Sequence, residues 1–172
     1  AEVVRVAEGF HEAKVAEIAD AVAARRDDVR IVLVAGPSAS GKTTFIRRLG
    51  IQLQVNGIRP VGVSLDNYFV DRERTPAGAD GRPDYESIEA LDLELFNANL
   101  AALLAGDEVE VPRYDFVSGR RVARDQWSRL CLAPDQALLV EGIHGLNPRL
   151  TAALPESAKF RVYISALFFF NV

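Results

Sequence analysis

The stretch "AGPSASGKTTFIRRL", residues 35–49, follows directly on an apolar run, "RIVLVA", at residues 30–35. Such a short and nearly continuous apolar run is typical of a parallel strand that is buried on both faces of its sheet. The spacing of apolar residues predicts a helix over residues 43–56, which Gly57 is well placed to end. We therefore expect a buried strand, a loop rich in small residues and a helix in direct succession.

The loop between these two elements carries the pattern G-x-x-x-x-G-K-[ST], formed by Gly36, Gly41, Lys42 and Thr43. Glycines allow backbone N–H groups to approach phosphate oxygens, and the start of the helix adds its positive end to the same anion. Lys42 is expected to reach the outer phosphates of a nucleoside triphosphate, and the Thr43 hydroxyl to bind Mg²⁺. The expected nucleotide contacts are Gly36, Ser38, Ala39, Ser40, Gly41, Lys42, Thr43 and Thr44. The alternative is a glycine-rich turn that only caps a helix.

The rest of the chain alternates between strand and helix patterns. Further buried strands are predicted at residues 59–66, 136–142 and 160–167, and further helices at 3–26, 88–105 and 147–154. The first helix carries an apolar stripe of Phe10, Val15, Ile18, Ala19 and Val22. Residues 67–87 form a long loop, and residues 107–124 form a β-hairpin that turns at Ser118-Gly119. The expected fold is α/β, with a P-loop NTPase-type parallel sheet, helices on both faces and a small β-hairpin.

Two carboxylates stand at the ends of predicted strands, Asp66 after the second and Glu141 after the third. Because the carboxyl ends of parallel strands meet in one crevice, we expect both side chains to lie beside the phosphate loop. There one carboxylate can help to hold Mg²⁺, and one that lies close to an incoming hydroxyl can accept its proton. The alternative is that each carboxylate caps a helix or pairs with an arginine.

The amino-acid composition limits the classes of molecule that the protein is expected to bind. A net charge of −4 argues against broad nucleic-acid binding, and no apolar run is long enough to span a membrane. A single cysteine fits a reducing compartment, so we expect a cytoplasmic protein. No N-K-x-D base-reading motif is present, which argues against a GTPase, and the sequence leaves a homo-oligomer open.

The motifs "GPSASGKTT", "SLDNYF", "PRYDF" and "LLVEGI" resemble, in this order, the uridine kinase and phosphoribulokinase group of P-loop kinases. The resemblance covers roughly residues 30–167, and "VDRERTP" with "EGIHGLNPRLT" is similar to a bacterial uridine kinase-like branch. It implies an ATP- and Mg²⁺-dependent kinase that transfers the γ-phosphate to a hydroxyl of a small molecule, with the 5′-hydroxyl of a nucleoside such as uridine preferred.

The same resemblance assigns roles to individual residues. It implies that Asp66 and Lys42 are catalytic, with Asp66 activating the acceptor hydroxyl. It also implies that Asp66 and Glu141, together with Thr43, belong to the magnesium site. It implies that Glu86 binds ribose hydroxyls, that Tyr114 lines the nucleoside pocket, and that Tyr68 of "SLDNYF" also contacts the acceptor. The hairpin is then expected to overhang the acceptor site.

Two departures from the family pattern leave alternatives open. Gly119 stands where uridine-cytidine kinases have a base-reading histidine, so another hydroxylated metabolite, such as a sugar phosphate or a pantothenate-like alcohol, is an alternative acceptor. The family also follows its fourth strand with an arginine-rich lid, whereas here "VYISAL" runs straight into "FFFNV". A non-catalytic nucleotide-binding regulatory module is therefore a further alternative.

The domain boundaries follow from these patterns. We expect residues 1–29 to form an N-terminal helix that covers the sheet or links to an upstream domain, and residues 30–172 to form the P-loop kinase domain. Residues 160–167 and "FFFNV" both read as strands, but no turn or crossover lies between them. We therefore expect a break in the backbone near residues 166–169, where the lid segment is missing, and a further strand of the sheet after it.

Overall fold

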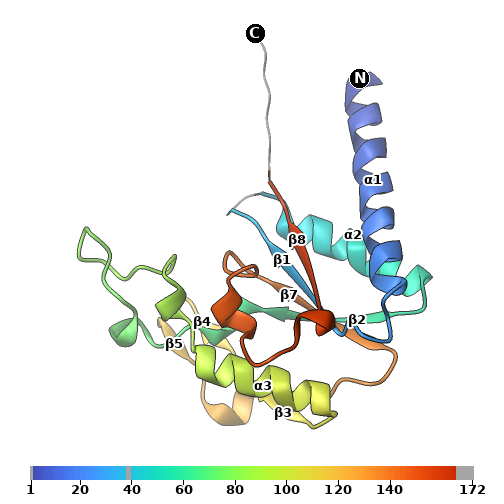
Figure 1. Ribbon diagram of the computed structural model, residues 1–172. Helices are drawn as coiled ribbons and strands as arrows, with labels where there is room; N and C mark the ends of the chain where they lie inside the picture. The colour runs from blue at the N-terminus through green and yellow to red at the C-terminus, as the bar shows by residue number, and fades with distance from the viewer. Residues whose placement is uncertain (1, 38–39, 166–172) are drawn as a thin grey trace.

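Four parallel strands form the central sheet of the computed structural model, which describes residues 2–37 and 40–165 (Figure 1). The strands lie in the order β2-β7-β1-β8. Their bounds are β1 (Ile31–Ala35), β2 (Arg59–Ser64), β7 (Gln136–Glu141) and β8 (Lys159–Tyr163). All neighbouring strands are parallel, so the segments that join them cross over the faces of the sheet. The predicted α/β fold class is confirmed.

Strand β1 is buried on both faces because its side chains alternate between two cores. Val32 and Val34 pack in the core that includes helices α1 (Glu2–Ala23) and α2 (Lys42–Val55). Ile31 and Leu33 pack in the opposite core, which includes helix α3 (Leu93–Ala105). Every residue of β1 is at most 2% exposed, as the continuous apolar run predicts.

Helix α1 buries side chains only in its C-terminal half, although Glu12 still pairs with Arg48 of α2. Val15, Ala19 and Val22 are fully buried, but Phe10 is 74% exposed. Figure 1 shows the reason, because the N-terminal half of α1 extends beyond α2 and the sheet. The apolar stripe predicted on this helix is therefore buried or partly buried from Val15 onward but not at Phe10.

Helix α3 begins later than the sequence pattern predicts. The Asp92 carboxylate accepts a hydrogen bond from the Leu95 N–H at 3.0 Å, which caps the first turn at that point. The preceding residues form a separate 3₁₀ turn, η3 (Ile88–Ala90). The helix ends at Gly106, whose φ of +89° places it in the left-handed conformation that favours glycine.

Strand β2 differs from the prediction of a second buried strand. Among the described strands it lies at the edge of the sheet, and only Val63 of its six residues is buried. The strand also ends at Ser64, and the next residues form a 3₁₀ turn, η1 (Leu65–Tyr68), that contains Asp66. The Ser64 hydroxyl accepts a hydrogen bond from the Asp66 N–H at 3.4 Å, which caps this turn. Asp66 therefore belongs to a capped turn and not to the strand itself.

The predicted hairpin is divided into two small ribbons. Strands β4 (Tyr114–Asp115) and β5 (Arg120–Arg121) pair in antiparallel fashion around the Ser118-Gly119 turn, which confirms the turn. Strand β3 (Val109–Val111) pairs instead with β6 (Ser128–Leu130), further along the chain. The hairpin proper is therefore much shorter than residues 107–124.

The remaining elements are short 3₁₀ helices: η2 (Arg72–Arg74), η4 (Arg124–Gln126), η5 (Pro148–Thr151) and η6 (Glu156–Ala158). η5 replaces the short α-helix expected at 147–154, and Asn147 caps it as expected. The backbone break and further strand expected near residues 166–169 lie outside the described residues. No helix within residues 2–37 and 40–165 has the length and apolar character that crossing a bilayer requires.

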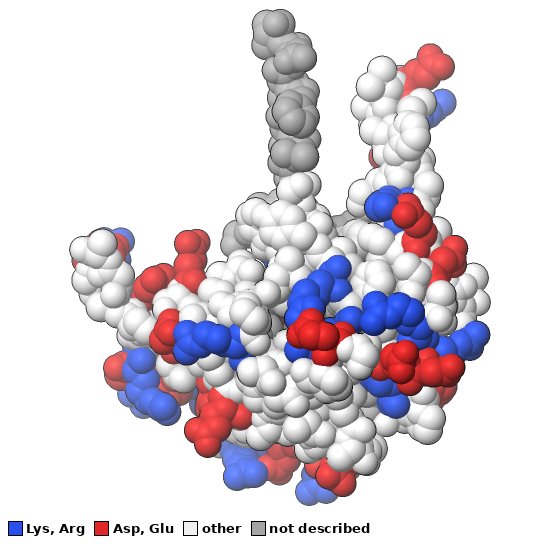
Figure 2. Space-filling model, viewed as in Figure 1, with Lys and Arg blue, Asp and Glu red and all other residues white. Residues whose placement is uncertain are grey.

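Acidic and basic side chains lie intermixed over the face shown in Figure 2. Several of them form exposed ion pairs, such as Arg149 with Glu89 at 2.6 Å. Exposed pairs of this kind contribute about 1 kcal/mol or less, because solvent screens them and the side chains lose freedom. Stability therefore rests mainly on the two apolar cores.

Replacement of Leu49 tests this conclusion. Leu49 of α2 is fully buried in the core shared with α1 and the sheet, so Leu49→Ala should lower the free energy of unfolding by about 2–5 kcal/mol. Ile51 lies on the same helix but is 60% exposed, and Ile51→Ala should change it by about 0.5 kcal/mol or less. Urea denaturation followed by circular dichroism measures both. Equal losses in the two variants would contradict the assigned core.

Candidate functional site

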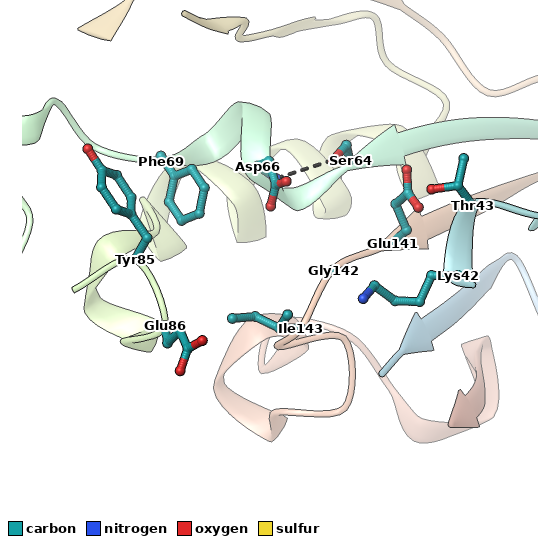
Figure 3. Close-up of a pocket in the computed structure, with 10 residues that line it drawn as sticks. All are labelled: Lys42, Thr43, Ser64, Asp66, Phe69, Tyr85, Glu86, Glu141, Gly142 and Ile143. Atoms are coloured by element: carbon teal, nitrogen blue, oxygen red, sulfur yellow. Dashed lines mark hydrogen bonds between the residues drawn. The ribbon is translucent and has the colours of Figure 1, made fainter. Parts of the chain in front are cut away.

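The carboxyl ends of three strands meet at one level across the sheet. In the strand register Val34 of β1 lies opposite Glu141 of β7, and Glu141 lies opposite Ser64 of β2. A cleft of about 390 Å³ opens at this edge, as Figure 3 shows. Lys42 and Thr43, at the start of α2, line the same cleft. The parallel register thus brings the phosphate-loop motif and the strand-end carboxylate to one place.

The loop before α2 has the backbone geometry that its glycines predict. Gly41 adopts a left-handed φ of +85°, directly before the first residue of the helix. At Gly36 a Cβ atom would lie only 2.4 Å from the Ile164 carbonyl oxygen, so a larger residue would displace β8 or the loop. The Lys42 ammonium donates to the carbonyls of Gly36 and Pro37, at 2.7 and 2.6 Å. The loop therefore wraps around the Lys42 side chain beside the open N-terminus of α2.

Not all of the loop residues that are expected to contact nucleotide are among the residues that the structure describes. Ser38 and Ala39 lie outside the described residues. The Ser40 hydroxyl is buried and has no hydrogen-bond partner among the described residues. Thr43 lines the cleft, whereas Thr44, the next residue, is exposed and does not line it. Ser40 is not among the residues that line the cleft, so its contact with nucleotide stays a prediction.

Asp66 and Glu141 both have raised pKa values in the cleft, and the charge of Asp66 acts on Glu141. Desolvation in the cleft raises the pKa of the Asp66 carboxyl above its ordinary value, and the charge of Lys42 opposes that rise. Desolvation also raises the pKa of Glu141, and the negative charge of Asp66 raises it further, again against Lys42. Two desolvated carboxylates, one of which feels the charge of the other, favour a bound cation between or beside them.

The residues present fit a magnesium ion. The Thr43 hydroxyl and the carboxylates of Asp66 and Glu141 all face the cleft (Figure 3). Within the described residues there is no cluster of three or more histidine, cysteine, aspartate or glutamate side chains that could hold a metal. Mg²⁺ commonly takes only one or two protein carboxylates and completes its shell with water and substrate phosphates. The oxygen donors here therefore suit Mg²⁺ accompanied by a phosphate ligand.

The far side of the cleft is formed by a different set of residues. Phe69, Tyr85, Glu86 and Ile143 line it, and Figure 3 shows Tyr85 and Glu86 on the side opposite Lys42 and Thr43. Glu86 thus lines the same cleft as Lys42 and Asp66, and its contact with an acceptor stays a prediction. An aromatic ring, an aliphatic side chain and a carboxylate at one end of a polar cleft suit a small molecule with a flat apolar part and several hydroxyls.

Two tyrosines that were expected at this site lie elsewhere. Tyr68 is 1% exposed, packs edge to face on Phe96 at 4.8 Å, and accepts a hydrogen bond from the Asn99 amide. Tyr114 is 5% exposed and stands behind Tyr85, with their hydroxyl oxygens 3.2 Å apart. We therefore correct both assignments, because Tyr68 is a core residue and Tyr114 supports the cleft wall from behind.

Tyr85 takes the position that sequence reasoning gave to Tyr114. It sits in the long loop that has no hydrophobic period, so no pattern indicated which way its ring would point. The only local signal was its place directly before Glu86. Phe69 and Ile143 are the last residues of "SLDNYF" and "LLVEGI" but were missed for the same reason, since each lies in irregular backbone.

The wall of the far side is held in place by Arg121 of β5. Its guanidinium donates to the carbonyls of Tyr68 and Phe69, both at 2.9 Å, and forms a partly buried ion pair with Asp92 at 2.9 Å. Because Asp92 also caps α3, this one side chain ties the hairpin to η1 and to the helix. The position of the hairpin beside the cleft therefore depends on a charged hydrogen-bond network.

Comparisons with known proteins agree with this geometry. Residues 31–167 match the phosphoribulokinase / uridine kinase family. The uridine kinase of Deinococcus deserti is 31% identical over 79% of this chain and 61% of its own length. The inorganic pyrophosphatase TTM2 of Arabidopsis thaliana is 34% identical over 76% of this chain, but over only 17% of its own length. The chain thus spans about three fifths or less of these curated relatives.

A solved structure shows the same fold. A protein described as a possible uridine kinase from Bacillus stearothermophilus superposes with a TM-score of 0.60, over 78% of this chain and 70% of the other, at 21% identity. The match of residues 31–167 covers the phosphate loop, Asp66, Glu86 and Glu141 together. This chain therefore belongs to the phosphoribulokinase / uridine kinase family.

Proposed function

We propose that the protein is an ATP- and Mg²⁺-dependent kinase that transfers the γ-phosphate to a hydroxyl of a small molecule, with the 5′-hydroxyl of a nucleoside preferred. The observation that carries this proposal is the shared cleft, in which Lys42, Asp66 and Glu86 line one continuous space. Membership of the family and the uridine kinase among the curated relatives support it. The pyrophosphatase relative matches over too small a part of its length to favour hydrolysis.

On this proposal the donor side binds the triphosphate. Backbone N–H groups at the start of α2 face the phosphates, and Lys42 exchanges its two carbonyl partners for phosphate oxygens. A Mg²⁺ ion held by Thr43, Asp66 and Glu141 would neutralise charge that develops on the transferred phosphoryl group. Phosphoryl transfer requires little covalent chemistry from the protein, so positioning and charge account for most of the catalysis.

Asp66 is the residue we assign to the acceptor hydroxyl. It lies in the capped turn η1, between the phosphate loop and the far side of the cleft, as Figure 3 shows. Desolvation raises the pKa of its carboxyl, which makes it a stronger proton acceptor than an exposed aspartate. Asp66 would take the proton from the hydroxyl as the bond to phosphorus forms. Glu86 would bind the neighbouring hydroxyls of the acceptor, and Tyr85 and Phe69 would cover its apolar part.

Two other functions remain as alternatives to a nucleoside kinase. Gly119 offers no side chain with which the hairpin could read a base, which leaves another hydroxylated metabolite as acceptor. A nucleotide-binding regulatory module needs the phosphate loop but has no use for Asp66 and Glu86 in the same cleft. The retention of both carboxylates favours the kinase.

An acceptor panel tests the proposed function. The protein should release ADP from ATP and Mg²⁺ when uridine or another nucleoside is added, and much less without an acceptor. Sugar phosphates and pantothenate belong in the same panel. Lys42→Ala should abolish this release and keep the native circular dichroism spectrum, because Lys42 is only partly buried and bonds to the loop alone. If ATP binds but no acceptor stimulates turnover, the regulatory module is the better description.

Substitutions of Asp66 and Glu141 should have different effects on the kinetics. Asp66→Asn should lower kcat by about 100-fold or more and leave the Kd for ATP nearly unchanged, because an amide cannot accept the hydroxyl proton. Glu141→Gln should instead raise the Mg²⁺ concentration needed for half-maximal activity. Steady-state kinetics over a magnesium series and ATP titration by calorimetry measure these effects. Identical losses of ATP affinity in both variants would contradict the role assigned to Asp66.

Substitution of Glu86 should affect the binding of the acceptor and not the binding of ATP. Glu86→Ala should raise the KM for the acceptor about tenfold and leave the KM for ATP within about twofold, since hydrogen bonds to a charged group contribute about 1.5–3 kcal/mol. Glu89, three residues later, is a matched control, because it is exposed and pairs with Arg149 outside the cleft. Glu89→Ala should change neither constant. An equal rise in both KM values for Glu86→Ala would place Glu86 outside the acceptor site.

A further inference from the structure

Arg72 of η2 lies directly against the turn of the β4–β5 hairpin. Its backbone N–H donates to the Gly119 carbonyl at 2.8 Å, and its guanidinium donates to the Phe116 carbonyl at 3.3 Å. At Gly119 a Cβ atom would come within 2.5 Å of the guanidinium carbon. Gly119 also has a φ of +72°. Glycine at this position therefore leaves the space that the Arg72 side chain fills.

The same guanidinium reaches the wall of the cleft. Its Nε donates to the Tyr85 hydroxyl at 3.4 Å, and that hydroxyl lies 3.2 Å from the hydroxyl of Tyr114. Tyr85 lines the cleft, whereas Tyr114 is buried behind it. The hydrogen bond with Tyr85 raises the pKa of Arg72 most, and the charges of Tyr114 and the neighbouring Glu73 raise it less. Arg72 thus connects the hairpin to Tyr85 through oxygen acceptors.

The ring of Tyr85 is only partly buried at the edge of the larger apolar core. Among the described residues it packs edge to face on Phe69 at 5.2 Å and, more distantly, on Tyr114 at 6.5 Å. The loop that carries it has no long regular element. A side chain on such a loop loses considerable conformational freedom when it is ordered against a ligand. Hydrogen bonds from Arg72 and Tyr114 reduce that cost, because they order the ring before the ligand arrives.

We propose that Arg72, seated against Gly119, is the positioning residue of the acceptor side, which holds Tyr85 in the cleft wall and fixes the hairpin beside it. Arg72 does not line the cleft itself, so it acts through Tyr85. Gly119 has a role in this arrangement that requires no contact with the substrate, since it admits the guanidinium. The kinetic part of this proposal rests on the proposed function, but its structural part does not.

The structural part can be tested without an acceptor, by ultraviolet titration of the tyrosines. The chain contains four tyrosines, and the pKa of Tyr85 is lowered, first by its hydrogen bond with Tyr114 and then by Arg72, with a smaller effect of Thr75. Removing a cation destabilises the phenolate, so Arg72→Gln should move the lowest tyrosine titration to higher pH. Tyr85→Phe should remove that titration altogether, which assigns it to Tyr85.

Glycine substitutions separate displacement of Arg72 from backbone strain. Gly119→Ala should shift the Tyr85 titration in the same direction as Arg72→Gln, because the new methyl group would displace the guanidinium. Gly81 is the matched control, since its φ of +75° is nearly the same but no atom lies within 4 Å of its would-be Cβ. Gly81→Ala should carry the same left-handed strain and leave the titration unchanged.

The kinetic part of the proposal is tested by comparing the KM for the acceptor with the KM for ATP. Arg72→Gln and Gly119→Ala should each raise the acceptor KM about tenfold and leave the KM for ATP within about twofold, by the magnitude of a charge-assisted hydrogen bond. Arg72→Lys should restore only part of the loss, because one ammonium cannot reproduce the planar fork that reaches Phe116 and Tyr85. In an Arg72→Ala background, Gly119→Ala should add no further rise in KM.

The outcomes distinguish this proposal from the proposed function. If no acceptor is found, the titration series still decides whether Arg72 orders Tyr85. An unchanged Tyr85 titration in both Arg72→Gln and Gly119→Ala would overturn the proposal even in an active kinase. So would a rise in acceptor KM for Gly81→Ala equal to that for Gly119→Ala, because backbone strain alone would then explain the effect.

Discussion

The parallel register of β2, β7 and β1 is the constraint on which the site depends. It places Ser64, Glu141 and Val34 at one level, so that the segments leaving all three strands begin at the same edge of the sheet. A shift of one residue in either pairing would turn Glu141 to the opposite face and remove it from the cleft. The buried apolar residues of β1 and β7 specify that register, because any other would expose them or bury polar groups.

Local sequence patterns predicted those helices and strands whose limits are determined by neighbouring residues in the chain. The limits of β1, α2 and β7 agree with the sequence to within a residue or so, because apolar runs and the glycine-containing loop report directly on backbone and burial. The position of β2 at the edge of the sheet could not be predicted in this way. The sequence of β2 looks like that of a buried strand. The order of strands in a sheet depends on contacts between segments that are far apart in the sequence, which a local pattern does not contain.

The residues of the candidate site likewise fall into those that a local pattern predicts and those that it does not. Lys42, Thr43, Asp66 and Glu141 follow motifs attached to strand ends or to a helix start, and the structure brings all four to one cleft. The aromatic residues of the far side lie in irregular backbone, where no period indicates direction. Tyr68 therefore turns into the core from a 3₁₀ helix, while Tyr85, which carries no motif, lines the cleft.

The two sides of the cleft are consequently stabilised by different means. On the proposed function, the donor side is built from main-chain geometry: a glycine loop packed closely against the residue that follows β8, a helix N-terminus and the register of the sheet. The acceptor side is held by side chains, through the Arg121–Asp92 ion pair and the contacts of Arg72. Substitutions on the acceptor side can therefore change its shape without disturbing the sheet. A fold organised in this way can keep one phosphate donor site while its acceptor changes, since only the second depends on exchangeable side chains.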